Sequence, residues 1–198
     1  MRPFNSQAVP KPPRPEFLDD IDWSIPTDLE LGSGAGLFAI RYSQMHPERQ
    51  LIAIERTSEK FLKMKGRALN HGSPTNLFID QSDVVNWVTH FTPSSSIENY
   101  FIWYPNPYPK PQQKNKRYHN MPFTELQMDR LKTGGHLYLA TNQTSYFEEA
   151  LLVYEKVWGL SVVEHKTVDP LKQKPRTHFE KKYLQRGEPC FEACFKKV

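Results

Sequence analysis

Short apolar runs alternate with longer amphipathic segments along most of this chain. Five apolar runs of strand length lie at 28–32, 51–55, 76–80, 99–104 and 135–141. The segments between them repeat their apolar positions at helical spacing, and they lie at 36–46, 57–71, 83–91, 121–132 and 144–157. Strands that alternate with helices in this way predict βαβ units, which form a mostly parallel sheet with helices on both faces.

Two further strands are predicted late in the chain, at 161–165 and 190–196, as an antiparallel pair at one edge of the sheet. The first 27 residues differ from the rest because they hold six prolines and no hydrophobic period. We expect them to form an extended arm, ordered only where another part of the protein holds it. The predicted organisation is therefore an arm at 1–27 and one α/β domain at 28–198.

Length and composition narrow the class of protein. A chain of 198 residues suits one domain, and its 12 Phe, 9 Tyr and 4 Trp can fill a core. No apolar stretch approaches the length of a membrane span, and the N-terminus lacks the apolar centre of a signal peptide. The two cysteines, Cys190 and Cys194, have no His or Cys neighbours at zinc-binding spacing. The sequence thus predicts a cytoplasmic protein without a structural metal.

The charge is distributed unevenly. The net charge is +4, yet residues 110–117 carry Lys110, Lys114, Lys116 and Arg117 with no acid among them. A second basic stretch lies at 166–182. Charge runs are often ordinary solvated surface, whereas two basic loops in a balanced chain also suit a polyanionic partner such as a nucleic acid. Both interpretations stay open on charge alone.

A glycine-rich turn follows the first predicted strand. The sequence LELGSGAG (29–36) gives G-x-G-x-G, in which glycine lets the backbone turn sharply and approach a ligand. Leu37 stands where a dinucleotide fingerprint needs its third glycine. Glu30 would repel a pyrophosphate but suits a ligand with an ammonium group, such as S-adenosylmethionine. A tight turn without any ligand is the alternative.

Polar residues also follow the second and third predicted strands. Glu55 ends the second strand, where a carboxylate can accept both hydroxyls of a ribose. Asp80, Ser82 and Asp83 follow the third strand, where they can cap the next helix or bond an adenine amino group. Suitable residues at three strand ends on one sheet edge favour a nucleoside-containing cofactor.

Prolines alternate after the fourth strand. Pro105, Pro107, Pro109 and Pro111 predict an extended segment over 104–111, and the basic residues follow at once. A proline-rich ligand for a partner domain is one interpretation. The position at the carboxyl edge of the sheet favours a loop that contacts the substrate.

These residues together resemble the bacterial tRNA (guanine-N7-)-methyltransferases. The resemblance rests on LELGSGAG, IAIER, SDVVNWV, YPNPYPK…KNKR…PF, GGHLYLATN and THFEKKYLQRGEP, which occur in the family's order over roughly residues 28–196. It implies a Rossmann-like class I methyltransferase fold, with a mostly parallel seven-stranded sheet and an antiparallel C-terminal strand. It also implies S-adenosylmethionine as cofactor, tRNA as partner, and a monomer or homodimer.

The resemblance assigns roles to individual residues. The expected cofactor-binding residues are Glu30, Gly32, Ser33, Gly34, Gly36, Glu55, Arg56, Ser82 and Asp83. The expected substrate-binding residues are Lys110, Asn142, Thr177, His178, Phe179 and Glu180. Asn106 stands at the position of the family's catalytic aspartate.

Two departures from the family pattern bear on activity. The family's P-D-P-W is Pro105-Asn106-Pro107-Tyr108 here, and its A-T-D ends in Asn142. Both changes remove a negative charge that would favour the cationic product of guanine N7 methylation. A catalytically weakened RNA-binding homologue, or a methyltransferase of small molecules or proteins, is therefore kept as an alternative.

Overall fold

Seven strands form a single mixed sheet in the order β3-β2-β1-β4-β5-β7-β6 in a computed structural model that describes residues 2–198. The strands are β1 (Thr27–Leu31), β2 (Gln50–Ile54), β3 (Leu77–Asp80), β4 (Ile97–Trp103), β5 (Leu131–Thr141), β6 (Leu160–Thr167) and β7 (Phe191–Lys197). The α-helices are α1 (Leu37–Met45), α2 (Ser58–Asn70), α3 (Val84–Phe91), α4 (Phe123–Arg130), α5 (Thr144–Lys156) and α6 (His178–Gln185). Short 3-10 helices are η1 (Ser6–Ala8), η2 (Glu16–Asp20), η3 (Pro111–Lys116) and η4 (Tyr118–Asn120).

The sheet has the predicted topology. Neighbouring strands from β3 to β5 pair in parallel, whereas β7 lies between β5 and β6 and runs antiparallel to both. The expected α/β fold with an antiparallel C-terminal strand is confirmed. Because the five strands β1 to β5 are parallel, their carboxyl ends meet at one edge, and that edge holds the residues singled out in the sequence.

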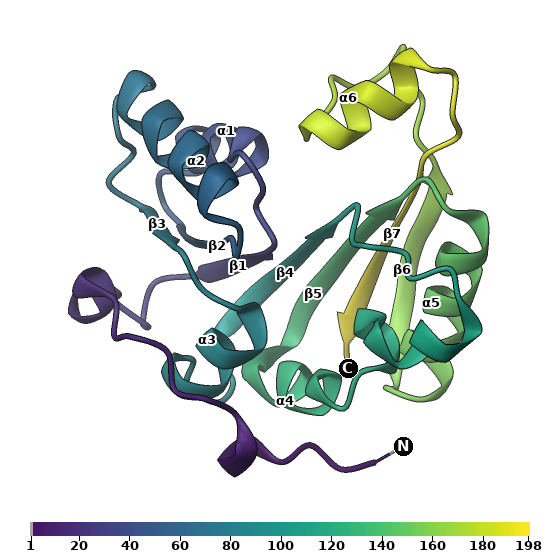
Figure 1. The fold of residues 1–198 in the computed structure, drawn as a ribbon, viewed down its shortest axis with the longest axis horizontal. Coiled ribbons are helices and arrows are strands. Elements are labelled where there is room, and N and C mark those ends of the chain that lie inside the picture. The colour runs from purple at the N-terminus through teal and green to yellow at the C-terminus, as the bar shows by residue number, and fades with distance from the viewer. Residues whose placement is uncertain (1) are drawn as a thin grey trace.

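Helices cover both faces of the sheet, and each face has its own apolar core. On one face Trp87 of α3, Phe123 of α4 and Tyr154 of α5 pack in a large buried cluster. On the other face Ala39 of α1 and Met64 of α2 pack against a smaller cluster. Alternate residues of the central strands serve the two cores, because successive side chains of a strand point to opposite faces. Figure 1 shows α1 and α2 beside the β1–β3 half of the sheet.

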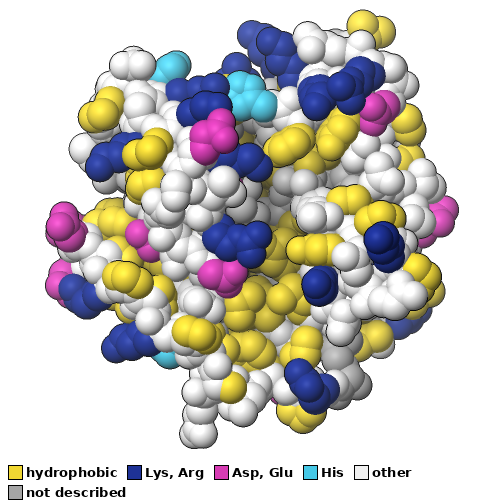
Figure 2. Space-filling model, viewed as in Figure 1, with side chains coloured by type: hydrophobic (Ala, Val, Ile, Leu, Met, Phe, Trp, Pro, Cys, Tyr) yellow, Lys and Arg dark blue, Asp and Glu magenta, His cyan; other side chains and the backbone are white. Residues whose placement is uncertain are grey.

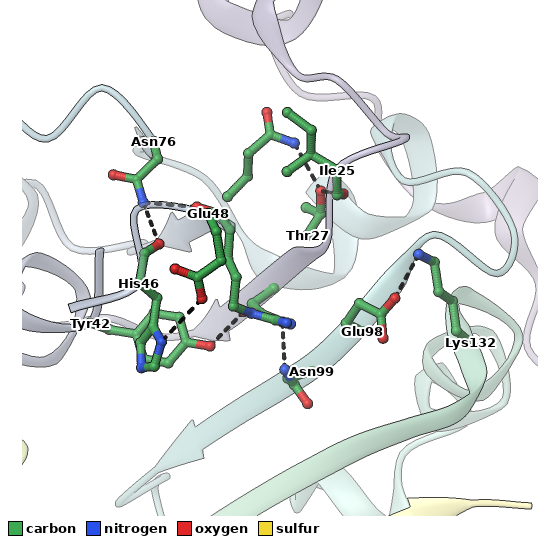
Figure 3. Close-up of polar contacts among 12 residues, drawn as sticks. Ile25, Thr27, Tyr42, His46, Glu48, Asn76, Glu98, Asn99 and Lys132 are labelled. Atoms are coloured by element: carbon green, nitrogen blue, oxygen red, sulfur yellow. Dashed lines mark hydrogen bonds and ion pairs between the residues drawn. The ribbon is translucent and has the colours of Figure 1, made fainter. Parts of the chain in front are cut away.

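A buried ion pair fixes the opposite, amino end of β1. Asp28 is fully buried and accepts hydrogen bonds from Arg49 Nε at 2.7 Å and Nη2 at 2.6 Å. Tyr42 Oη at 2.7 Å and Asn99 Nδ2 at 2.7 Å donate to the same carboxylate. Figure 3 shows Tyr42 and Asn99 turned toward this cluster from α1 and β4. Full pairing offsets the cost of burying a charge and ties three elements together.

The N-terminal arm is held by the body of the protein. Phe4 donates its backbone N–H to Glu125 of α4 at 2.8 Å, and its ring meets that of Phe123 edge to face. The ring of His90 in α3 bonds the carbonyl of Val9 at 2.9 Å. The arm therefore follows α4 and α3 before the chain enters the sheet, as Figure 1 shows.

One helix was not predicted. α6 lies in the connection between β6 and β7, beyond the end of β6 in Figure 1. It has eight residues, and Thr177 caps it by accepting a hydrogen bond from the N–H of Glu180 at 3.1 Å. α6 thereby carries the T-x-F-E residues toward the carboxyl edge of the sheet.

Candidate active site

Two adjoining cavities lie at the carboxyl edge of the sheet. The larger has a volume of about 600 Å³ and the smaller about 300 Å³. Both are lined by Gly32, Gly34, Lys60, Trp103 and Phe179, so they meet at the glycine-rich turn. In Figure 2 hydrophobic side chains gather in a hollow near the middle of this face, with Lys and Arg around it.

The glycine-rich turn has the backbone that its sequence predicts. Gly32, Gly34 and Gly36 have φ of 83°, 57° and 77°, a region that favours glycine. A Cβ at Gly32 or Gly34 would meet no atom within 4 Å, whereas one at Gly36 would strike Met64. The first two glycines thus leave room for a ligand, and the third lets α1 pack closely on α2.

Glu55 holds this turn in place. Its Oε2 accepts a hydrogen bond from the N–H of Gly34 at 2.8 Å, and its Oε1 accepts from the N–H of Thr57 at 2.8 Å. The residue is buried, with 6% exposed, and lines the larger cavity. Each carboxylate oxygen keeps a second lone pair for a ligand hydroxyl.

The residues after β3 frame the same cavity. Asp83 caps α3 by accepting a hydrogen bond from the N–H of Val85 at 2.9 Å, and its second oxygen lies 4.0 Å from Arg56 Nη1. Both Asp83 and Arg56 line the larger cavity. Ser82 is buried beside them and does not line either cavity, and Asp80 closes β3 with its pKa raised by burial.

Glu30 is the most perturbed acid of the site. It is 2% exposed, lines the smaller cavity, and its Oε2 has no hydrogen-bond partner among residues 2–198. Burial raises its pKa to about 8, and the charge of Glu55 adds to the shift. Ser33 lies next to it and lines the same cavity. An orphaned buried carboxylate next to open glycines fits a cationic ligand such as the methionine end of S-adenosylmethionine.

The proline loop turns more sharply than the sequence predicts. Tyr104 and Tyr108 have positive φ of 52° and 42°, so the expectation of an extended segment over 104–111 is wrong at these two positions. Tyr104 is held there by its N–H, which donates to Ala140 at 2.7 Å, and by its hydroxyl, which donates to Glu180 at 2.8 Å. Such backbone is rare outside glycine and is found where surrounding contacts enforce it, often at functional sites.

Arg117 holds the proline loop in place through hydrogen bonds to its backbone. It is 6% exposed, donates to the carbonyls of Pro107 and Tyr108 at 3.0 Å each, and forms an ion pair with Glu149 of α5. Its guanidinium is therefore committed within the protein. A contact of Arg117 with a polyanion, together with the neighbouring lysines, stays a prediction, and in this structure its guanidinium bonds the protein itself.

The remaining loop residues face solvent or the cavity. Asn106 and Lys116 both line the larger cavity, and Asn106 Oδ1 accepts a hydrogen bond from the N–H of Tyr108 at 3.2 Å. Lys110 is exposed at the start of η3 and lines neither cavity. The structure thus brings Asn106 to the predicted cofactor residues and leaves Lys110 outside.

The four residues of T-x-F-E have different environments. Thr177, His178 and Phe179 line the smaller cavity, and Phe179 lines the larger one as well. Glu180 is fully buried, and its oxygens accept from the Tyr104 hydroxyl at 2.8 Å and from Arg176 Nε at 3.1 Å. Burial alone would raise the pKa of Glu180, but the bonds from Arg176 lower it below the ordinary value. Glu180 therefore joins α6 to the start of the proline loop.

Asn142 lines neither cavity. It follows β5, and its Nδ2 donates to Glu188 Oε2 at 2.8 Å. A carboxylate therefore stands beside the position where the family has an aspartate. Its predicted contact with substrate stays a prediction.

Sequence reasoning missed much of the cavity lining. The residues concerned are Phe38, Lys60, Lys63, Arg67, Trp103, Tyr104, Tyr108, Tyr118 and Met121. The aromatic run at the end of β4 and the spacing of Lys60, Lys63 and Arg67 on one face of a predicted helix could have indicated some of them. Among residues 2–198, no group of three His, Cys, Asp or Glu is placed to hold a metal ion. Within the same range no helix is long and apolar enough to cross a membrane.

Comparison with known proteins gives one family and a consistent set of relatives. A family model described as "Putative methyltransferase" matches residues 24–193. The tRNA (guanine-N(7)-)-methyltransferase of Nitrosomonas eutropha is 29% identical over 192 residues, which are 96% of this chain and 85% of that protein. The enzyme of the same name from Salmonella typhi is 26% identical over 87% of this chain and 73% of its own length.

Solved structures show the same fold. A 16S rRNA methyltransferase, KamB, superposes with a TM-score of 0.67 at 13% identity, over 87% of this chain and 88% of that one. A SAM-dependent methyltransferase from Aquifex aeolicus gives a TM-score of 0.61 at 15% identity, over 93% of this chain and 94% of that one. At these identities the likeness concerns the fold alone.

Proposed function

This chain belongs to the methyltransferase family whose model spans residues 24–193, and we propose from this premise that it methylates N7 of a guanine in tRNA. The fold and the family make it an S-adenosylmethionine-dependent methyltransferase. The substrate is inferred from the relatives named as tRNA (guanine-N(7)-)-methyltransferases, at 25–29% identity over most of the chain.

One observation carries the proposal. The predicted cofactor residues Glu55 and Asp83 and the proline-loop residue Asn106 line a single cavity of about 600 Å³. A volume of this size accommodates a cofactor together with part of a second ligand. A transferase needs its two substrates side by side, and this cavity offers that arrangement.

The predicted cofactor-binding residues suit different chemical groups of S-adenosylmethionine. When bound, S-adenosylmethionine supplies an electrophilic methyl group on a sulfonium centre. Glu30 would pair with its ammonium group, Glu55 would accept the ribose hydroxyls, and Asp83 lies on the wall nearest the adenine in this assignment. Gly32 and Gly34 leave the space above the turn open.

Methylation of guanine N7 requires little of the protein beyond alignment of the base with the methyl group. Guanine N7 has a lone pair in the plane of the ring, so no side chain has to remove a proton before attack. The protein must hold N7 in line with the methyl group, which is mainly a proximity effect. Trp103, Tyr104 and Tyr108 line the cavity and offer aromatic faces against which a base can stack.

Asn106 stands where the family has an aspartate, and it keeps part of the hydrogen-bonding capacity of that residue. Its amide oxygen can still accept a hydrogen bond from the base, although it lacks the charge that would stabilise a cationic purine. We infer a slower enzyme of the same type. A cytoplasmic location and a monomeric or homodimeric state accompany this proposal as expectations.

Transfer of labelled methyl groups tests the choice of substrate. The protein is incubated with labelled S-adenosylmethionine and, in separate reactions, unmodified tRNA, 16S ribosomal RNA or a mixture of proteins. The proposal predicts label in tRNA only. Label in ribosomal RNA or protein but not in tRNA would overturn it.

A further inference from the structure

One wall of the smaller cavity consists of cations to which the proposed function gives no role. α2 presents Lys60, Lys63 and Arg67 to this cavity, and their spacing of three and four residues places them on one face of the helix. His178 of α6 lines the cavity next to them and contacts Arg67. Figure 2 shows Lys and Arg gathered around a His toward the top of this face.

Acidic side chains neutralise little of the positive charge on this wall. Glu59 pairs with Lys63 at 2.6 Å, in an exposed contact of the kind that contributes little. Lys60 and Arg67 form no ion pair with any residue of 2–198, and Lys60 Nζ lies 5.3 Å from the ring centre of Phe179. The pKa of His178 is lowered by burial and then by the positive charges of Arg67, Lys181 and Arg41. The wall therefore has positive charge available for an anion.

A further cation, Lys116, lies on the other side of the larger cavity from Lys60. Lys116 lines that cavity from η3, and Lys60 lines it from α2. α2 packs on one face of the sheet, while η3 adjoins η4 and, through it, α5 on the other. A ligand that enters between them thus has positive charge on both sides.

We propose that the α2 wall binds a backbone phosphate of the RNA, on the side of the target nucleotide opposite Lys116. The inference rests on the proposed function, because it takes the RNA as the ligand of the larger cavity. A nucleotide drawn out of its stack keeps a phosphate on each side, and single-stranded nucleic acid is bound by cationic grooves with aromatic platforms. Phe179, which lies between the two cavities and under Lys60, supplies such an aromatic surface.

The carboxylate of the cofactor is the competing anion for this wall. It is a single charge on a small molecule, so its binding depends on cofactor concentration and not on RNA. An RNA phosphate instead contributes to the salt dependence of RNA binding, because each contact releases counterions. The two sources are therefore separable in one set of variants.

The test compares two double variants with equal loss of charge. Lys60→Gln with Lys63→Gln removes two cations of the wall and leaves Arg67, which also donates to Ala35 at 2.7 Å. Lys65→Gln with Lys156→Gln removes two exposed lysines outside both cavities. Binding of unmodified tRNA is measured over a series of salt concentrations, and S-adenosylmethionine affinity is measured by calorimetry.

The wall variant should lower the slope of log affinity against log salt by about 0.7–0.9, which is the contribution of one phosphate contact. The control variant should keep the wild-type slope, and both should keep the wild-type cofactor affinity. An unchanged slope in the wall variant would overturn the proposal, and weaker cofactor binding with an unchanged slope would assign the wall to the cofactor carboxylate.

The test of the phosphate site can be told apart from the test of the proposed methylation reaction. If the wild type binds tRNA and forms no 7-methylguanosine, the proposed reaction fails, while the difference in slopes still decides the phosphate site. If the wild type binds no tRNA at any salt concentration, both proposals fall.

Discussion

Glu55 and Gly34 are joined across 21 residues of sequence by a hydrogen bond of 2.8 Å from the Gly34 N–H to the Glu55 carboxylate. This contact fixes the glycine-rich turn against the end of β2. The acid predicted to hold the ribose thus also shapes the surface on which the cofactor would lie. Binding geometry and local fold depend on the same side chain.

Gly34→Val should abolish S-adenosylmethionine binding while the protein stays folded. A Cβ at this position meets no protein atom within 4 Å, so the valine side chain starts into the space left for the ligand. The positive φ costs about 1–2 kcal/mol for a residue with a side chain. Gly72→Val is the matched control, because Gly72 has φ of 82° and open space but lines neither cavity. Equal cofactor affinity in the two variants, measured by calorimetry, would contradict the site.

Cofactor binding should release a proton near neutral pH. In the free protein Glu30 has its pKa raised from 4.5 to about 8 by burial, and an ammonium group placed beside it would lower that pKa again. Calorimetry in buffers of different ionisation enthalpy should show this release at pH 6–7 for the wild type and not for Glu30→Gln. Identical proton release in both proteins would remove Glu30 from the cofactor site.

The same pKa predicts how stability depends on pH. The folded state holds a proton on Glu30 that the unfolded state has lost between about pH 4.5 and 8, so Glu30 makes the protein less stable as the pH rises through that window. Glu30→Gln should flatten this part of the profile in urea unfolding without cofactor. A profile as steep as that of the wild type would show that another group is responsible.

Restoring the family acids should have unequal effects. Asn106→Asp places a charge beside the larger cavity and should raise kcat/KM on tRNA about tenfold, which corresponds to about 1.4 kcal/mol. Asn142→Asp should add nothing, because Asn142 Nδ2 now donates to Glu188 at 2.8 Å and an aspartate there would face a like charge. Steady-state kinetics of the single and double variants decides this, and no gain from Asn106→Asp would indicate adaptation to another substrate.

The loop cations should separate into two kinds. Lys110, Lys114 and Lys116 are exposed, and their joint change to Gln should lower the salt slope of tRNA binding by about 2–3. Arg117→Gln should instead leave the slope unchanged and lower both stability and rate, because Arg117 holds the carbonyls of Pro107 and Tyr108. A flattened slope in Arg117→Gln would mean that this residue reaches the RNA after all.

The mostly parallel sheet and most element boundaries followed from the sequence, because the apolar runs and the helical periods are local properties. β1 and β2 begin one residue before the predicted runs, and the G-x-G-x-G turn has the positive φ that three glycines favour. The acids at the strand ends reached one edge because parallel strands must place them there. The resemblance supplied the substrate, which no periodicity could give.

What the sequence could not predict depends on contacts between distant segments. α6 was missed, and its packing depends on Glu180 bonding Tyr104 and Arg176, which come from outside the helix. The burial of Arg117 depends on Glu149, which lies 32 residues away on α5. The positive φ of Tyr104 opposes local preference and exists because the surrounding hydrogen bonds hold it.

Nucleoside analysis of tRNA is the most direct test of the proposed reaction. Unmodified tRNA is incubated with the protein and S-adenosylmethionine, digested to nucleosides and separated by mass spectrometry. The proposed reaction predicts 7-methylguanosine as the new methylated nucleoside, in an amount that rises with time and is absent with Gly34→Val. A methyl group on any other nucleoside or atom, or no methylation by a protein that binds both cofactor and tRNA, would contradict it.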